Sequence, residues 1–281
     1  MWIWMAVASA VLLGLYDVAK KQSLQHNGVL EVLLCATALS TLFLCPFLKA
    51  GPLPDHLSLV LKAVLVTLSW VSGLAAMKLL PITIASTIKA SRPVFVLLLS
   101  ILIFEERLNG LQWGGVALTL GSLMMLSVSG KREGIDFLRS RGVGYMALSV
   151  ISGVASALYD KHIMMHMEPL FVQAWTNLYI TVMLGVCVLV QRLLHRSARR
   201  FEWDWMLVVI ALLITVADYL YFSALNQEGS MLSVISLARR GSVIVTFFCG
   251  ALVFREKRVG RKAIVLSVLL AGLVLLVLGS S

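Results

Sequence analysis

Charged residues are scarce in this sequence. They make up 14% of its 281 residues, against about 25% in an average soluble domain, while 59% of the residues are hydrophobic. Apolar stretches near the ~20 residues needed to cross a bilayer recur along the whole chain, and nothing of domain size lies outside them. The sequence therefore predicts a polytopic membrane protein.

Patterns typical of enzymes and metal sites are also missing. The chain has no glycine-rich phosphate loop, no Ser/His/Asp arrangement and no pair of catalytic carboxylates. Its four cysteines lie within apolar stretches without metal-ligand spacing, which favours packing roles. The net charge of +10 is spread over short loops and helix ends, which argues against nucleic-acid binding. We therefore expect no enzyme, no cofactor, no metal and no nucleic-acid partner.

The apolar stretches predict an all-α membrane protein with ten transmembrane helices. Their expected ranges are 2–22, 29–49, 57–78, 81–104, 109–129, 142–162, 169–190, 204–226, 231–254 and 261–279. Residues 104–110 align with 254–260, and residues 15–17 align with 158–160, which indicates a duplication. The chain thus divides into five-helix halves, 1–130 and 142–281. Because five is odd, the halves enter the membrane in opposite senses, and such inverted repeats are typical of secondary transporters.

Each half carries two cations in the middle of an apolar helix. Lys89 and Arg92 lie in the fourth expected helix, and Arg239 and Arg240 lie in the ninth. Lys89 and Arg92 follow the start of their helix by about 12 and 16 Å, which is mid-bilayer depth. A cation facing lipid at that depth costs ~2.5–3.5 kcal/mol, so all four must face a hydrated or ion-paired interior.

Two hypotheses explain these cations. In the first, they bind an anion between the two halves, supported by Ser86 and Ser236, because arginine can hold a phosphate or carboxylate in bidentate fashion. In the second, they only pair with carboxylates inside the helices. The candidates for such pairing, or for proton coupling, are Asp17, Asp160 and Asp218. Three acids leave one of the four cations unpaired, unless Glu31 lies deep enough to balance it.

Other residues inside the helices are weaker candidates. Tyr219 and Tyr221 in the eighth helix and Trp70 in the third could line a cavity, although core packing is the commoner use. Gly110 and Gly114 have the GxxxG spacing typical of close helix packing, either within the chain or in a homodimer.

These features resemble the EamA-like members of the drug/metabolite transporter superfamily. The resemblance rests on the two five-helix halves, on residues 14–20, and on the runs 86–107 and 236–257. It implies a multi-pass transporter of the bacterial cytoplasmic (inner) membrane, with a central cavity lined by helices three, four, eight and nine. A cation in helix four and a pair in helix nine are similar to the phosphate-binding cations of sugar-phosphate translocators. That likeness reaches Lys89, Arg239 and Arg240, with Tyr219 or Tyr221 as a looser match, whereas Arg92 departs from it.

We therefore expect a secondary transporter that moves a small anionic or zwitterionic metabolite by alternating access. The alternatives are a flippase for a phosphate-bearing lipid and a non-transporting membrane assembly protein with structural ion pairs.

The two lines of argument disagree about orientation. Sixteen Lys and Arg residues fall in the odd-numbered connections; the exceptions are Lys49, Lys62, Arg107 and Lys161. This bias puts the odd connections in the cytoplasm and the termini outside. The family resemblance implies cytoplasmic termini.

Overall fold

The chain forms α-helices and one short 3-10 helix, which confirms the expected all-α fold. The computed structural model describes residues 1–24, 27–80, 88–89, 91–128, 140–194, 201–254 and 259–280. The first half contains α1 (Trp2–Ser23), α2 (Val29–Leu44), η1 (Cys45–Phe47), α3 (Leu53–Leu79), α5 (Arg92–Phe104) and α6 (Gly110–Val128). The second half contains α7 (Arg141–Met164), α8 (Pro169–Leu194), α9 (Met206–Asn226), α10 (Leu232–Arg239), α11 (Ser242–Phe254) and α12 (Val259–Ser280).

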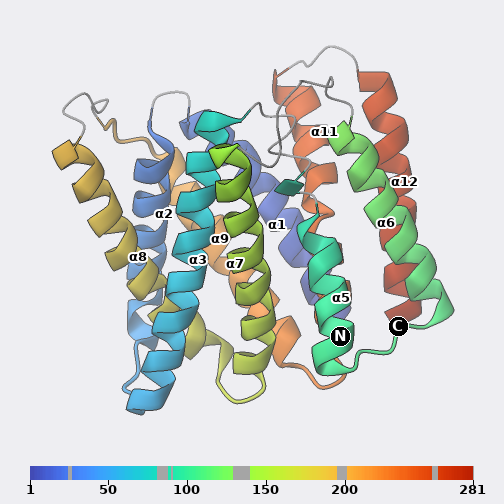
Figure 1. The fold of residues 1–281 in the computed structure, drawn as a ribbon, viewed down its shortest axis with the longest axis horizontal. Helices are drawn as coiled ribbons and strands as arrows, with labels where there is room; N and C mark the ends of the chain where they lie inside the picture. Colours follow the sequence, from blue (N-terminus) through green and yellow to red (C-terminus); the bar gives the residue numbers. More distant parts are fainter. Residues whose placement is uncertain are drawn as a thin grey trace.

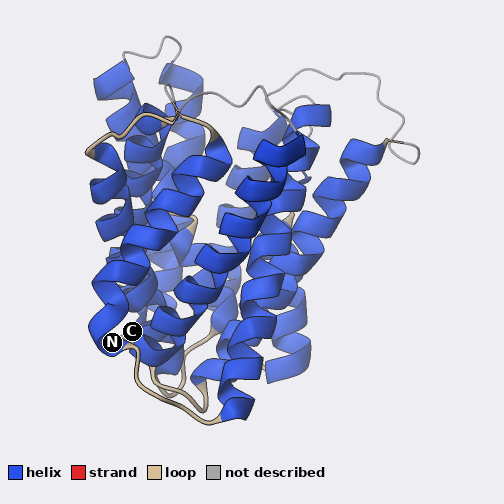
Figure 2. Cartoon of the chain, turned by 90° about the vertical axis from the view of Figure 1, so that its left-hand side faces the viewer, coloured by secondary structure: helices blue, strands red, loops and turns tan. Residues whose placement is uncertain are grey.

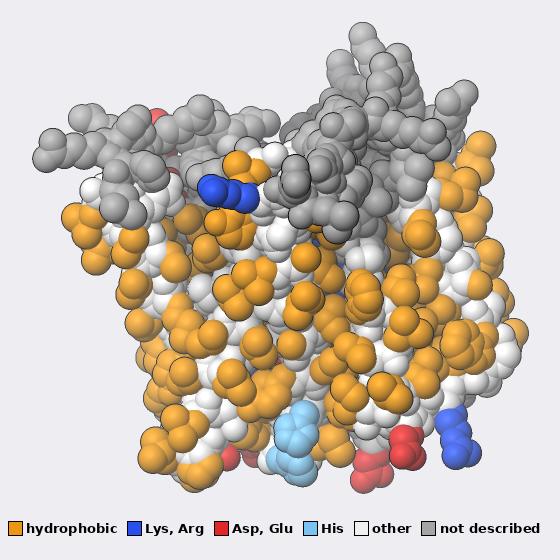
Figure 3. All heavy atoms as spheres, in the orientation of Figure 1, with side chains coloured by type: hydrophobic (Ala, Val, Ile, Leu, Met, Phe, Trp, Pro, Cys, Tyr) orange, Lys and Arg blue, Asp and Glu red, His pale blue; other side chains and the backbone are white. Residues whose placement is uncertain are grey.

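The outer surface is that of a membrane-spanning bundle. Six of the described helices, α1, α2, α3, α7, α8 and α9, are long and apolar enough to cross a membrane. Apolar side chains cover the middle of the molecule, whereas the charged side chains visible in this view lie near its two ends (Figure 3). The loops also gather at these ends (Figure 2), and α1 begins at the end where α12 finishes (Figure 1). The bundle therefore crosses the membrane an even number of times.

Contacts between the two halves follow a two-fold pattern. α1 packs along α9, and its counterpart α7 packs along α3. α2 packs on α8 and α6 packs on α12, so each of these helices meets its own counterpart. Exchanging the halves maps this pattern onto itself, as expected for an inverted repeat with a pseudo-two-fold axis.

The helices that carry the central cations are broken, contrary to the continuous ranges predicted. The ninth divides into α10 and α11 at Arg240 and Gly241, whose amides donate to carbonyls three residues back, each at 2.9 Å. In the first half α5 begins only at Arg92, and the Ser91 amide donates to the Ile88 carbonyl at 3.1 Å. These three-residue hydrogen bonds interrupt the α-helical ladder beside the cations in both halves. Residues 81–87 and 90 of the predicted fourth helix lie outside the described residues.

Close packing of α6 uses a different glycine from the predicted pair. A Cβ atom at Gly110 would meet nothing within 4 Å, and one at Gly114 would meet only Leu275 at 3.6 Å. A Cβ atom at Gly115 would lie 2.8 Å from the carbonyl oxygen of Gly272. The close approach of α6 to α12 thus depends on Gly115 and Gly272.

Candidate functional site

A central cavity of about 530 Å³ lies between the two halves. Its walls come from α1, α2, α3, residue 89 and α5 of the first half, and from α7, α8, α9 and α10 of the second. The helices expected to line it all take part, and the first, second, sixth and seventh helices join them. This volume falls in the range of roughly 300–1,000 Å³ typical of small-molecule sites.

Three of the four predicted cations line this cavity: Lys89, Arg92 and Arg239. Arg240 does not line it. It lies half-buried in the turn between α10 and α11, near enough to Arg92, Arg239 and Asp17 for electrostatic interaction. Ser236, in α10, is also not a lining residue, and Ser86 lies outside the described residues.

A buried ion pair between the halves forms part of the cavity lining. Lys62 Nζ lies 2.8 Å from Asp160 Oδ1, and the two side chains are 2% and 11% exposed. The contact is one of charges rather than an aligned hydrogen bond, because neither atom meets hydrogen-bond geometry. Lys62 Nζ also lies 3.8 Å from the centroid of the Phe222 ring, and the Tyr221 hydroxyl donates to Asp160 Oδ2 at 3.2 Å.

Sequence reasoning missed Lys62. We expected Lys62 among the cations of the loops that connect the helices, and this is wrong. α3 begins at Leu53, so nine residues, or roughly 13 Å of helix, precede Lys62. The depth argument that singled out Lys89 and Arg92 applies equally to this lysine. With the helix start placed correctly, the sequence could have identified it.

A second ion pair, between Arg239 and Asp218, also contacts Tyr221. Arg239 Nη2 contacts Asp218 Oδ1 at 2.8 Å, and the Arg239 guanidinium carbon lies 4.1 Å from the centroid of the Tyr221 ring. Tyr221 therefore touches both ion pairs. Arg239 Nε is buried without a hydrogen-bond partner among the described residues.

The remaining cavity cations are not matched by acids. Arg92 Nη2 donates to the Gly153 carbonyl at 2.6 Å, and Lys89 is exposed. In the described part of the chain no carboxylate lies within 4 Å of either residue. Glu31 does not balance them, since it pairs with Arg192, whose side chain is 52% exposed. The lining contains five cations and two carboxylates: Lys20, Lys62, Lys89, Arg92 and Arg239, with Asp160 and Asp218.

The other predicted site residues divide between the cavity and its surroundings. Trp70 and Tyr221 line the cavity. Tyr219 does not and is 40% exposed, because it lies on a different face of α9 from Asp218 and Tyr221. Asp17 is not a lining residue either, but it interacts electrostatically with Lys20, Lys89 and Arg240.

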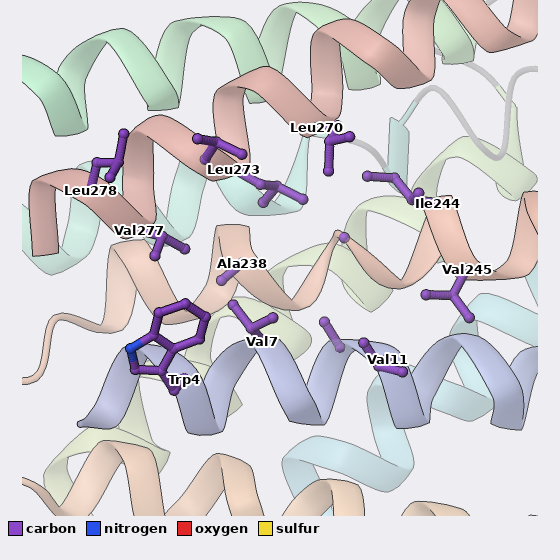
Figure 4. Close-up of a pocket in the computed structure, with 13 residues that line it drawn as sticks. Trp4, Val7, Val11, Ala238, Ile244, Val245, Leu270, Leu273, Val277 and Leu278 are labelled. Carbon is purple, nitrogen blue, oxygen red and sulfur yellow. The ribbon is translucent and has the colours of Figure 1, made fainter. Parts of the chain in front are cut away.

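A second hollow, of about 420 Å³, is wholly apolar. It lies between α1, α10, α11 and α12, with Trp4, Val245 and Leu278 among its lining residues (Figure 4). Trp4 and Leu278 are 63% and 58% exposed, so the hollow opens to the outer surface of the bundle. It contains no charged side chain and shares no lining residue with the central cavity. An anion would therefore bind in the central cavity rather than here.

Comparisons with known proteins agree with this architecture. A model of the EamA-like transporter family matches residues 1–128 and 140–278. The comparison with curated proteins gives no match. Among 29 matching chains of solved structures, one described as "Crystal structure of protein" has a TM-score of 0.79 at 14% identity, over 99% of this chain and 98% of that chain. At that identity the likeness shows the fold alone. Because the family match covers nearly the whole chain, this protein belongs to the EamA-like transporter family and is a multi-pass membrane transporter, not an enzyme.

Proposed function

We propose that this protein is a secondary transporter for a small organic anion, or for a zwitterion with a carboxylate, in a bacterial cytoplasmic membrane. The observation that carries the proposal is the excess of cations over carboxylates along the cavity. An unpaired cation in the interior, such as the half-buried Arg92, is costly, and a bound anion offsets that cost. The substrate would thus supply the missing negative charge.

Lys89, Arg92 and Arg239 have separate roles in this proposal. Lys89 and Arg92 have no carboxylate partner within 4 Å among the described residues, so they supply the main attraction. Arg239 lines the cavity while Asp218 holds it through Nη2, so it adds a positively charged group whose position is fixed. The purely structural hypothesis explains Lys62 and Arg239, whose ion pairs are formed, and gives Arg92 a hydrogen bond to the Gly153 carbonyl, but it leaves the charges of Lys89 and Arg92 without an acidic partner.

Alternating access would require the cavity to open at either end. The Lys62–Asp160 pair lies on the side of the bundle where α7 and α9 have their C-terminal ends. Lys20, Leu24 and Met77 line the cavity on the opposite side, near the C-terminal ends of α1 and α3. The breaks beside Arg92 and Arg240 give two hinges at which helix segments can move. Among the aspartates, Asp17 is our candidate for proton coupling, since Asp160 and Asp218 would first have to leave their ion pairs.

The two alternatives receive less support from the geometry. A lipid flippase would benefit from an apolar path joined to the headgroup site, but the apolar hollow and the cavity share no lining residue. An assembly protein would not need the unpaired cations.

Uptake into proteoliposomes tests the proposal. The probes are radiolabelled glutamate, 3-phenylpropionate and glucose 6-phosphate, with and without a proton gradient. We expect at least one anion to accumulate, and the double change Lys89→Ala/Arg92→Ala to reduce its uptake at least tenfold. Arg192→Ala, which removes a surface cation outside the cavity, is the matched control and should leave uptake unchanged. Full uptake by the double variant would contradict the proposal.

A further inference from the structure

One wall of the central cavity is apolar. It is formed by lining residues of α2, α3 and α8: Val29, Leu33, Val66, Trp70, Leu74 and Ile180. The same residues belong to a single hydrophobic cluster packed between these helices. The cluster makes this wall a continuous surface rather than a set of isolated apolar contacts.

A second wall carries the binding cations. Lys89 and Arg92 lie beside the break in the first half, Arg239 lies in α10, and α5 packs directly on α10. Figure 1 shows α2 and α8 on the opposite side of α7 from α5, so the apolar lining residues of α2 and α8 and the cation Arg92 come from different sides of the bundle. Apart from Lys62, whose charge is paired with Asp160, the lining is therefore cationic on one side and apolar on the other.

The helices of the apolar wall also carry polar lining residues, most of which already form hydrogen bonds within the protein. Ser69 Oγ donates to the Ser149 carbonyl at 2.8 Å, and Ser149 Oγ donates to the Ser69 carbonyl at 2.6 Å. Asn177 Nδ2 donates to Ser40 Oγ at 2.8 Å. Thr176 Oγ1 is a buried hydroxyl without a partner in the described ranges. A ligand with many hydroxyl groups would leave most of them unsatisfied against the apolar wall, which costs free energy.

We propose that the transported molecule is an organic anion with an apolar body. Its carboxylate or phosphate binds Lys89, Arg92 and Arg239, and its hydrocarbon or aromatic part packs against Trp70 and Val66. This inference rests on the proposed function and specifies its substrate class. It predicts rejection of strongly hydroxylated anions such as sugar phosphates and sugar acids.

Thermal unfolding of the full-length protein in detergent, titrated with matched ligands, tests the inference. The probes are 3-phenylpropionate, its uncharged analogue 3-phenyl-1-propanol, and the hydroxylated anions gluconate and glucose 6-phosphate. A ligand that binds the folded state raises the melting temperature. We expect a concentration-dependent rise with 3-phenylpropionate, and an affinity at least about tenfold weaker for the other three.

Two variants locate the apolar contact. Val66→Thr keeps the side-chain shape and should weaken 3-phenylpropionate about fourfold, the effect of one methyl-sized contact. Trp70→Ala should weaken it by about tenfold or more. Tyr219→Ala, on a face of α9 away from the cavity, is the control and should not change the affinity.

The possible outcomes separate this inference from the proposed function. Equal or tighter binding of gluconate or glucose 6-phosphate would overturn the apolar-body inference and leave the anion transporter standing. Equal binding of 3-phenyl-1-propanol would overturn the anion transporter, since charge would not matter. A melting temperature that responds to none of the three anions would overturn both.

Discussion

Lys62 Nζ and Asp160 Oδ1 lie 2.8 Å apart in the interior of the bundle, and each comes from a different half of the chain. α3 contributes the lysine and α7 the aspartate, along one of the two symmetry-related contacts between the halves. Because the pair is buried and joins the two halves, breaking it would destabilise the protein.

The losses of stability caused by substituting Lys62 and Asp160 one at a time should not add up in the double variant. Removing one partner of a buried ion pair costs about 3–5 kcal/mol, because the other charge stays buried and uncompensated. We expect losses of that order for Lys62→Met and for Asp160→Asn, and a loss for the double variant well below their sum. The measurement is the free energy of unfolding in detergent micelles, arranged as a double-mutant cycle.

The pair formed by Arg192 and Glu31 is the matched control. It also joins the two halves, but the Arg192 side chain is 52% exposed. Exposed pairs contribute about 0–1 kcal/mol, so the cycle with Arg192→Gln and Glu31→Gln should show little coupling. Strictly additive losses at Lys62 and Asp160 would show that the two charges do not interact.

A substitution at Gly153 would displace the Arg92 side chain while leaving Arg92 itself unchanged. A Cβ atom at position 153 would lie 2.7 Å from Arg92 Cζ and 2.9 Å from Ser69 Oγ. Gly153→Ala should therefore displace the guanidinium from the Gly153 carbonyl and reduce anion uptake about tenfold or more, as misplaced binding groups commonly do. Uptake in proteoliposomes and the melting temperature are measured together.

Gly144 provides the control on the same helix. A Cβ atom there would meet nothing within 4 Å, so Gly144→Ala should keep both uptake and stability. Normal uptake by Gly153→Ala would show that the position of Arg92 does not matter for transport.

The fold was predictable because it depends on features repeated along the sequence. Apolar stretches of bilayer length and the repeated 104–110 and 254–260 segments predict two five-helix halves, and the depth of Lys89 and Arg239 predicts that they face the interior. These arguments need only helix rise and the cost of a charge in lipid.

The predictions that failed depend on the rotation of a helix about its own axis and on packing between helices. The choice between Tyr219 and Tyr221 requires the rotation of α9 about its axis, which a nearly uniform apolar sequence does not reveal. The break at Arg240 and Gly241 depends on neighbouring helices that stabilise the interrupted hydrogen bonds. The apolar wall brings together residues from α2, α3 and α8, and only the tertiary structure shows that they share one surface.

Glu105 occupies a backbone conformation that favours glycine. It follows α5 with φ 51° and ψ 35°, in the left-handed region. A residue with a Cβ atom pays about 1–2 kcal/mol there, which glycine largely avoids. We expect Glu105→Gly to keep or raise the melting temperature and Glu105→Val to lower it. Glu168→Gly is the control and should lower it, since Glu168 does not have a positive φ. A clear loss of stability in Glu105→Gly would disprove this account.

The neighbouring Glu106 has a different role, because it caps a helix of the other half. Its carboxylate accepts hydrogen bonds from the Leu232 and Ser233 amides and from the Ser233 hydroxyl at the start of α10. Loss of an N-terminal cap typically costs about 0.5–2 kcal/mol. Glu106→Ala should therefore lower the free energy of unfolding by that amount, and Glu106→Gln by less. Glu105→Gln removes the same charge one residue away and should have little effect, whereas equal losses at both positions would argue for a general charge effect.

The corrected place of Lys62 removes one exception to the basic bias that predicts orientation in the membrane. Once this lysine is assigned to the interior, only Lys49, Arg107 and Lys161 remain as exceptions to the basic bias of the odd connections. We therefore expect the odd connections in the cytoplasm and the end of α12 outside, although the family resemblance implies the opposite. Alkaline phosphatase fused after residue 281 should be active and a fluorescent protein fused there should be dark. Fusions truncated after residue 140, in the basic fifth connection, should give the reverse pattern, and a fluorescent C-terminal fusion would decide for cytoplasmic termini.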